Sequence, residues 1–186
     1  MPSRPFRPLR CAAVATLLLP LLAACGGGGN EAKIAPACPQ LSLLHDAADL
    51  TRFAGPPGTP QDARGLILAA QITAVPATCA AAGEGRVRAR LQVQALLRRG
   101  PAAQSDSVAV PYFIAITDQG NVLSEEDHTL AAKFRPNVDE MRTNADRVEL
   151  LLPVTKAKSA AAYHLYVGFR LTPEELAYNR QSAGLP

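Results

Sequence analysis

Apolar and polar side chains alternate in three parts of the chain. In residues 86–95 every second side chain is apolar, and arginine or glutamine stands between them. Residues 148–154 and 163–171 repeat this alternation with leucine, valine and aromatic side chains. Successive side chains of a β-strand point to opposite faces of a sheet. The period of two therefore predicts three strands, each with one buried and one exposed face.

Four further segments are predicted to be strands. Residues 66–75 and 108–117 are less polar, which indicates strands that are better covered than the other three. A short strand is expected from Val122, and another over residues 129–134, where apolar side chains again alternate.

A predicted turn and a proline interrupt the strand pattern in this segment. The sequence TDQGNV predicts a hairpin turn, because Gly120 and Asn121 adopt a positive φ easily. Pro111 has no N–H to donate to a sheet ladder. Its position is therefore predicted to be a sheet edge or a bulge.

About seven strands without a long amphipathic helix between them predict an all-β fold. Consecutive strands would be joined by hairpins or loops, which favours an antiparallel β-sandwich on an immunoglobulin-like or fibronectin-like plan. A small open barrel is the alternative. We expect a single domain over residues 38–186.

Three segments depart from the strand pattern. Thr172, followed by proline and then Glu175, forms a capping box that predicts a short C-terminal helix to about Arg180. Residues 41–53 leave two interpretations open, a helical turn capped by Asp46 or an extended segment at a sheet edge. Residues 137–147 are rich in Asn, Asp and Arg and are expected to form a long exposed loop.

The first 24 residues have the composition of a secretory signal peptide. Three arginines at positions 4, 7 and 10 precede an apolar run of about 14 residues, too short to span a bilayer. The sequence LAAC that ends at Cys25 resembles a bacterial lipobox. That resemblance implies that Cys25 carries diacylglycerol and becomes the new N-terminus. Because the next residue is Gly26 rather than aspartate, it also implies sorting to the outer membrane, on its periplasmic side.

Residues 25–37 are predicted to be a lipidated cysteine followed by a flexible tether, because four glycines follow Cys25. The leader also accounts for the net charge of +3, which comes from 19 Lys and Arg against 16 Asp and Glu. Without the three leader arginines the chain is neutral. A neutral chain gives no electrostatic basis for binding nucleic acid, and we expect none.

The cysteines are few enough to assign by compartment. Cys11 leaves with the leader and Cys25 is expected to be lipidated, so Cys38 and Cys79 are the remaining pair. Such a pair in an oxidising compartment predicts a disulfide, while two buried thiols or a redox pair are the alternatives.

Motifs of catalysis or metal binding are absent from the sequence. His45, His128 and His164 do not fall in a metal-ligand spacing, and neither a nucleophile elbow nor a phosphate-binding glycine loop occurs. The acidic stretch SEEDH, residues 124–128, would point alternate side chains apart in a strand, although a loop could bring them together on calcium. We predict no catalytic residue, no cofactor and no metal.

Two groups of side chains are candidates for a contact surface. Arg86, Arg88 and Arg90 would form a ladder on one strand face, suited to carboxylate or phosphate. The alternative is an ordinary exposed sheet face paired with acids such as Glu149. Tyr178 and Arg180 are the second candidate, with packing against the sheets as the alternative.

Three stretches together resemble a family of small proteobacterial lipoproteins without an established activity. They are ACPQLSLLHDAADLTRF, RRGPAAQSDSVAVPYFIAITDQGNVL and YVGFRLTPEELAYNR. The resemblance covers most of the mature chain. It implies the lipid attachment at Cys25, the Cys38 and Cys79 pair, and a compact domain.

The function expected from these features is that of a lipid-anchored envelope protein. We expect a non-enzymatic accessory subunit, adaptor or structural component, held on the membrane by its lipid and bound to another envelope protein. A periplasmic binding module for a small ligand, glycan or metal is the alternative. An enzyme whose catalytic groups converge from distant loops is a third hypothesis.

Overall fold

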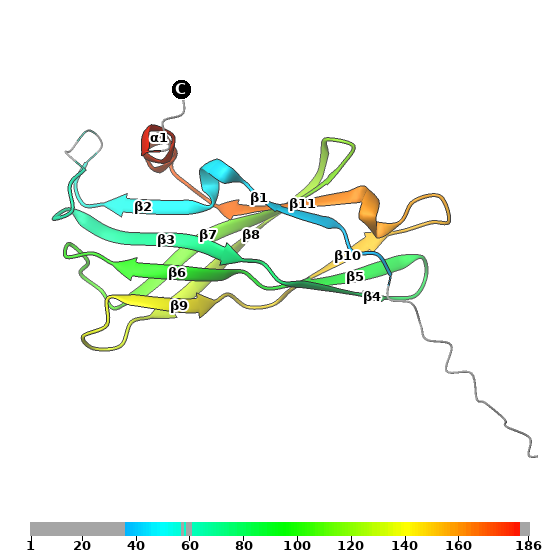
Figure 1. The fold of residues 1–186 in the computed structure, drawn as a ribbon, viewed down its shortest axis with the longest axis horizontal. Coiled ribbons are helices and arrows are strands. Elements are labelled where there is room, and N and C mark those ends of the chain that lie inside the picture. The colour runs from blue at the N-terminus through cyan, green and yellow to red at the C-terminus, as the bar shows by residue number, and fades with distance from the viewer. Residues whose placement is uncertain (1–35, 57, 59–60, 183–186) are drawn as a thin grey trace, which may run out of the picture. The chain divides into compact units, whose positions relative to one another are not determined.

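A computed structural model describes residues 36–56, 58 and 61–182 of the chain. Within these residues the fold is mostly β, with eleven strands in three sheets and one C-terminal α-helix (Figure 1). This confirms a β-rich fold with a short C-terminal helix, although the strands number eleven rather than about seven. The predicted signal peptide, Cys25 and residues 26–35 of the tether lie outside the described residues.

The first sheet has the strand order β1-β11-β7-β8. Its strands are β1 (Gln40–Leu43), β11 (Tyr163–Phe169), β7 (Ser107–Asp118) and β8 (Asn121–Lys133). β1 pairs with β11 in parallel, which corrects the purely antiparallel prediction. The two strands come from opposite ends of the chain, so no hairpin forces them to be antiparallel.

The other two sheets have the orders β2-β3-β6-β9 and β10-β5-β4. The second contains β2 (Asp49–Phe53), β3 (Leu66–Ala74), β6 (Gln94–Arg99) and β9 (Glu140–Asn144). The third contains β10 (Val148–Pro153), β5 (Arg86–Leu91) and β4 (Ala77–Ala81). In both sheets every pairing is antiparallel.

Three runs of chain pass directly from one of these sheets into the other. They are β3 into β4, β5 into β6, and β9 into β10, which lie end to end in Figure 1. At the crossing, Gln92 N donates to Pro76 O at 3.2 Å, and Ala145 N donates to Val93 O at 2.8 Å. The single strand predicted over residues 86–95 is therefore wrong, because it breaks after Leu91 and resumes in another sheet.

The inward positions of all three sheets share one hydrophobic core. β7 contributes Tyr112 and Ile114, β11 contributes Leu165, and the third sheet contributes Leu91 and Leu152, all almost fully buried. Burial of each large apolar side chain contributes about 1.5–3 kcal/mol, so this shared core is the main source of stability.

Several local predictions were incomplete. The expected short strand from Val122 and the strand over 129–134 form one strand, β8. The expected loop over 137–147 contains β9, and β4 was not predicted. The turn places Gln119 and Gly120 at positive φ, of 48° and 82°, rather than Gly120 and Asn121.

The segment 41–53 contains parts of both interpretations, but Asp46 does not cap the turn as predicted, because it lies within the turn and Leu44 is at the N-cap position without a side-chain cap. β1 and β2 are extended edge strands, and the 3₁₀ turn η1 (His45–Ala47) lies between them. Contrary to the prediction, Pro111 is neither on an edge strand nor at a bulge, because β7 is an interior strand with regular register there. It lies where pairing of β7 with β11 ends, so its missing N–H interrupts no ladder.

The disulfide between Cys38 and Cys79 is formed, as predicted, with the two Cα atoms 5.6 Å apart. It ties the start of the described chain to β4, an edge strand of the third sheet. The bridge closes a loop with a sequence separation of 41.

Replacing Cys38 and Cys79 with serine is expected to lower the free energy of unfolding by about 2–4 kcal/mol, because the unfolded chain regains the freedom of that loop. Urea titration of the full-length protein, followed by circular dichroism, measures this loss. Reductant should destabilise the natural chain and leave the double variant unchanged. Equal urea midpoints for both proteins would contradict the prediction.

Candidate functional site

The arginine ladder occupies the outward face of β5. Val87, Ala89 and Leu91 on the other face of this strand are buried in the core. The alternation of side chains therefore sends Arg86, Arg88 and Arg90 outward. Their position is as predicted, while their role as a contact surface stays a prediction.

Two of these arginines share one carboxylate. Glu149 on β10 lies opposite Arg90 in register. Its two oxygens contact Arg88 Nε at 2.5 Å and Arg90 Nε at 2.9 Å. The hydrogen bond from Arg90, with the charge of Arg88, holds the pKa of Glu149 below its ordinary value. Pairing with acids, the alternative interpretation of this face, is thus present, but one carboxylate offsets only one of the two charges.

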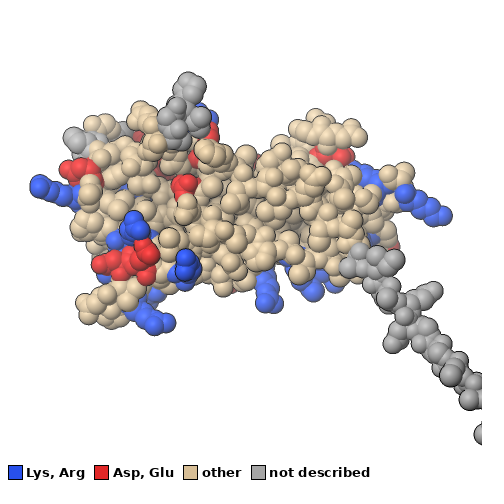
Figure 2. Space-filling view, viewed as in Figure 1, with Lys and Arg blue, Asp and Glu red and all other residues tan. Residues whose placement is uncertain are grey.

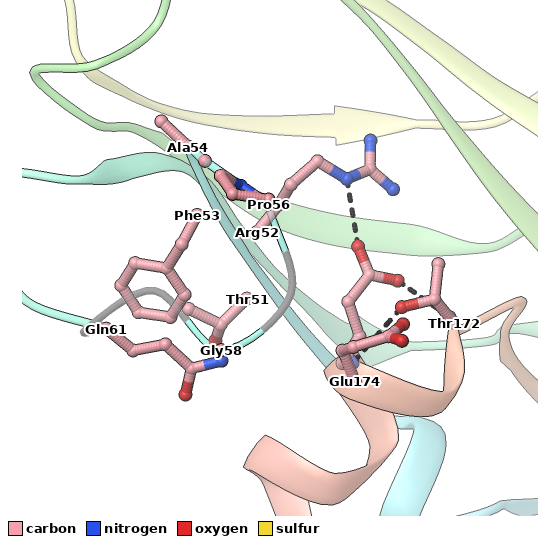
Figure 3. A pocket seen from close by; sticks show the side chains of 11 residues that line it. Thr51, Arg52, Phe53, Ala54, Pro56, Gly58, Gln61, Thr172 and Glu174 are labelled. Carbon is pink, nitrogen blue, oxygen red and sulfur yellow. Dashed lines mark hydrogen bonds and ion pairs between the residues drawn. The ribbon is translucent and has the colours of Figure 1, made fainter.

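The C-terminal helix α1 (Pro173–Ser182) is fixed to β2 through Glu175. Thr172 N donates to Glu175 Oε2 at 2.9 Å, and Glu175 N donates to Thr172 Oγ1 at 3.2 Å, which is the predicted capping box. Glu175 is buried and also accepts a hydrogen bond from Arg52 Nε of β2 at 2.9 Å (Figure 3). A single side chain therefore starts the helix and attaches it to the sheet.

Tyr178 and Arg180 both contact other parts of the fold. The ring of Tyr178 meets that of Phe53 edge-on at a centroid distance of 5.2 Å. Arg180 Nε donates to Asp46 Oδ2 at 3.0 Å, and this bond is the main reason that the pKa of Asp46 lies below its ordinary value. The packing expected as the alternative is present for Tyr178, and any contact with a partner would have to compete with these pairings.

A shallow groove lies between β2 and the start of α1. Arg52, Phe53, Gln61, Thr172 and Glu174 are among the residues that line its volume of about 230 Å³ (Figure 3). Pockets for small molecules usually measure about 300–1,000 Å³ and enclose most of the ligand. This groove is smaller and open, and Glu175 already engages the guanidinium at its end.

The acidic stretch 124–128 lies within β8, so its side chains point to alternate faces. On one face Arg170 binds both Glu125 and Asp127, and its guanidinium lies 4.5 Å from the centroid of the Phe113 ring. On the other face His128 Nε2 lies 3.6 Å from Glu126. Across the described residues, no three His, Cys, Asp or Glu side chains gather as metal ligands.

The free edge of β8 is the feature that the sequence did not indicate. β8 has 13 residues and, in the described part of the chain, pairs only with β7. Val122 and Leu123 at its start are 63% and 55% exposed. A long exposed edge presents a row of backbone groups to which another strand can bind.

The register identifies which backbone groups of β8 point outward. Pro111 O accepts a hydrogen bond from Arg170 N at 2.9 Å, so the backbone of Pro111 faces away from β8. Thr129 lies opposite Pro111 in the ladder. Because the direction alternates along an antiparallel pair, the N–H and C=O of Thr129 point to the free edge, as do those of Asp127 and Glu125.

Comparison with known proteins gave no match, neither to a family model nor to a curated protein nor to a solved structure. The resemblance to small proteobacterial lipoproteins therefore stays a prediction. Among the described helices, none is long and apolar enough to cross a membrane.

Replacing Glu175 with alanine is expected to lower the free energy of unfolding by about 2 kcal/mol, because the helix loses its cap and Arg52 loses its partner. Chemical denaturation measures the change, and hydrogen exchange should show α1 opening first. Glu174→Ala is the matched control, since this exposed neighbour should change stability by less than about 0.5 kcal/mol. Equal effects of the two variants would refute this role for Glu175.

Proposed function

We propose that the protein is a lipid-anchored adaptor on the periplasmic side of the outer membrane. It has no enzymatic role and binds an extended segment of another envelope protein along the free edge of β8. The long unpaired edge of β8 is the observation that carries this proposal.

Two features support export and anchoring. The lipobox-like sequence that ends at Cys25 follows a positively charged, apolar leader. The Cys38–Cys79 disulfide fits an oxidising compartment, since disulfides are rare in proteins of the bacterial cytosol. Two or more acyl chains would hold the protein stably on the membrane.

The charge of β8 favours a foreign strand over a second copy of this chain. Glu125, Glu126 and Asp127 lie consecutively in the strand. An antiparallel pair of two β8 strands centred here would place acid opposite acid, which is destabilising. A partner segment with Lys or Arg at these positions would instead gain cross-strand pairs.

We also propose a β-sandwich plan of the immunoglobulin or fibronectin type. The first sheet and the connected second and third sheets share one core, as the two layers of a sandwich do. The partner edge would then be one side of the first layer.

Lipidation is expected at Cys25 and nowhere else. Radiolabelled palmitate should be incorporated into the natural protein and the Cys11→Ala variant, and not into Cys25→Ala. Mass spectrometry of the mature protein should find an acylated N-terminus at Cys25. Labelling that survives in Cys25→Ala would reject the anchor.

Thr129→Pro is expected to abolish partner binding while leaving the fold intact. Proline removes the N–H that points to the free edge, and proline is tolerated in edge strands. The test is affinity purification from solubilised native membranes, with Thr129→Val as the matched control that keeps the N–H. One defined envelope protein should copurify with the natural chain and the valine variant only. Equal recovery with the proline variant would exclude the β8 edge.

A further inference from the structure

We propose that the outward face of the third sheet lies against anionic lipid headgroups of the membrane that carries the anchor. The face consists of the β5 arginines together with Glu149, Leu151 and Pro153 of β10. This inference rests on the lipid anchor of the proposed function and adds an orientation of the domain on the bilayer.

The disulfide fixes the chain that follows the predicted tether to the edge strand of this sheet. Cys38 follows the predicted tether directly and is bonded to Cys79 of β4. In the register of β4 with β5, Cys79 lies opposite the buried Ala89, so its side chain points to the core side of the sheet and the disulfide lies at the β4 edge, not on the arginine face. The third sheet is therefore the sheet to which the chain is covalently bonded directly after the predicted tether.

Basic residues are concentrated on this sheet and its connections. Residues 84–92 and 146–158 contain six Lys or Arg and three Asp or Glu, whereas the other described residues contain nine and twelve. Basic side chains project from the lower margin of the molecule in Figure 2, where β5 and the connection from β9 to β10 lie in Figure 1. The domain is neutral as a whole and positive at the end that receives the tether.

Arg88 and Arg90 retain donors for phosphate groups, whereas Arg86 Nη2 already donates to Glu84 at 2.5 Å. Glu149 contacts Arg88 and Arg90 through their Nε atoms, so the terminal Nη groups of both stay available in the described structure. Arg147, next to this face, has no ion-pair partner among the described residues. Guanidinium groups bind phosphate with two parallel hydrogen bonds, and exposed ion pairs exchange easily because they are weak.

An exposed leucine lies among these charges. Leu151 is 47% exposed and stands directly opposite Arg88 in the ladder. Pro153 stands opposite Arg86 in the same way. Apolar side chains flanked by basic residues are typical of surfaces that rest at the boundary of headgroups and acyl chains. The basic charge and the exposed apolar area of this face therefore both favour contact with the bilayer surface.

The chain has no tryptophan, so one introduced tryptophan is a unique fluorescent reporter. The test uses the acylated full-length protein with Leu151→Trp, on vesicles of phosphatidylethanolamine and phosphatidylglycerol that contain a lipid with a nitroxide headgroup. Leu123→Trp is the matched control, because Leu123 is similarly exposed on β8 of the first sheet. We expect Trp fluorescence to be quenched at least about twofold more strongly in Leu151→Trp, since only this face meets anionic lipid.

Charge variants in the Leu151→Trp background test the arginines. Each basic residue near an anionic surface changes binding by about fivefold. Arg88→Gln together with Arg90→Gln should therefore reduce quenching strongly. Glu149→Gln should increase it, because the charge that offsets Arg88 and Arg90 is lost. Vesicles of phosphatidylcholine alone should show weak quenching with every variant.

The outcomes separate this inference from the proposed function. Equal quenching of the two tryptophans, or no response to the charge variants, while the protein stays on the vesicles through its acyl chains, overturns the membrane-facing orientation and leaves the anchor intact. Protein that carries no lipid and does not stay on vesicles overturns both. Circular dichroism and the intact disulfide verify the fold of each variant.

Discussion

Where a strand passes from one sheet into the next, the residues that alternate toward the core have to stay on the core side. β5 and β6 meet this constraint simply, because the inward positions continue at every second residue from Val87 through Val93 to Leu97. In β3, which pairs with β6, the buried residues have even numbers, whereas in β4 the core side carries odd-numbered residues such as Cys79. The register shift between Ile72 and Ala74 adds one residue to β3, so that the core-facing positions continue correctly into β4. Without that bulge, the outward face of β4 would point into the core.

This continuous alternation determines which residues of all three sheets lie in the core and which face outward. The arginines of β5 face outward because the core side of the same strand is fixed by Val87, Ala89 and Leu91. The edge of β8 is free because β8 is the last strand of the first sheet and, among the described residues, pairs with β7 alone. The two surfaces proposed to bind lipid and protein are thus consequences of the same packing, on different sheets with opposite charge.

The elements predicted correctly from the sequence are those whose signal is local. β10 alternates through Val148, Leu150 and Leu152, and the capping box of α1 spans four consecutive residues. β9 was missed because it is a partly exposed edge strand without a continuous apolar period. The parallel direction of β1 depends on β11, which lies far along the chain. Likewise, no local pattern connects Arg52 with Glu175, which are 123 residues apart.

The position of the disulfide also determines how the domain carries mechanical force. Cys38 precedes β1 in the chain, so tension applied through the tether passes across the sulfur atoms into β4 before it reaches the short parallel strand. β1 has only four residues and lies at an edge, where strands can be peeled off one hydrogen bond at a time. The covalent bridge protects that weak strand from pulling, so the proposed anchoring at one end and partner binding at the other could stretch the domain without unravelling β1.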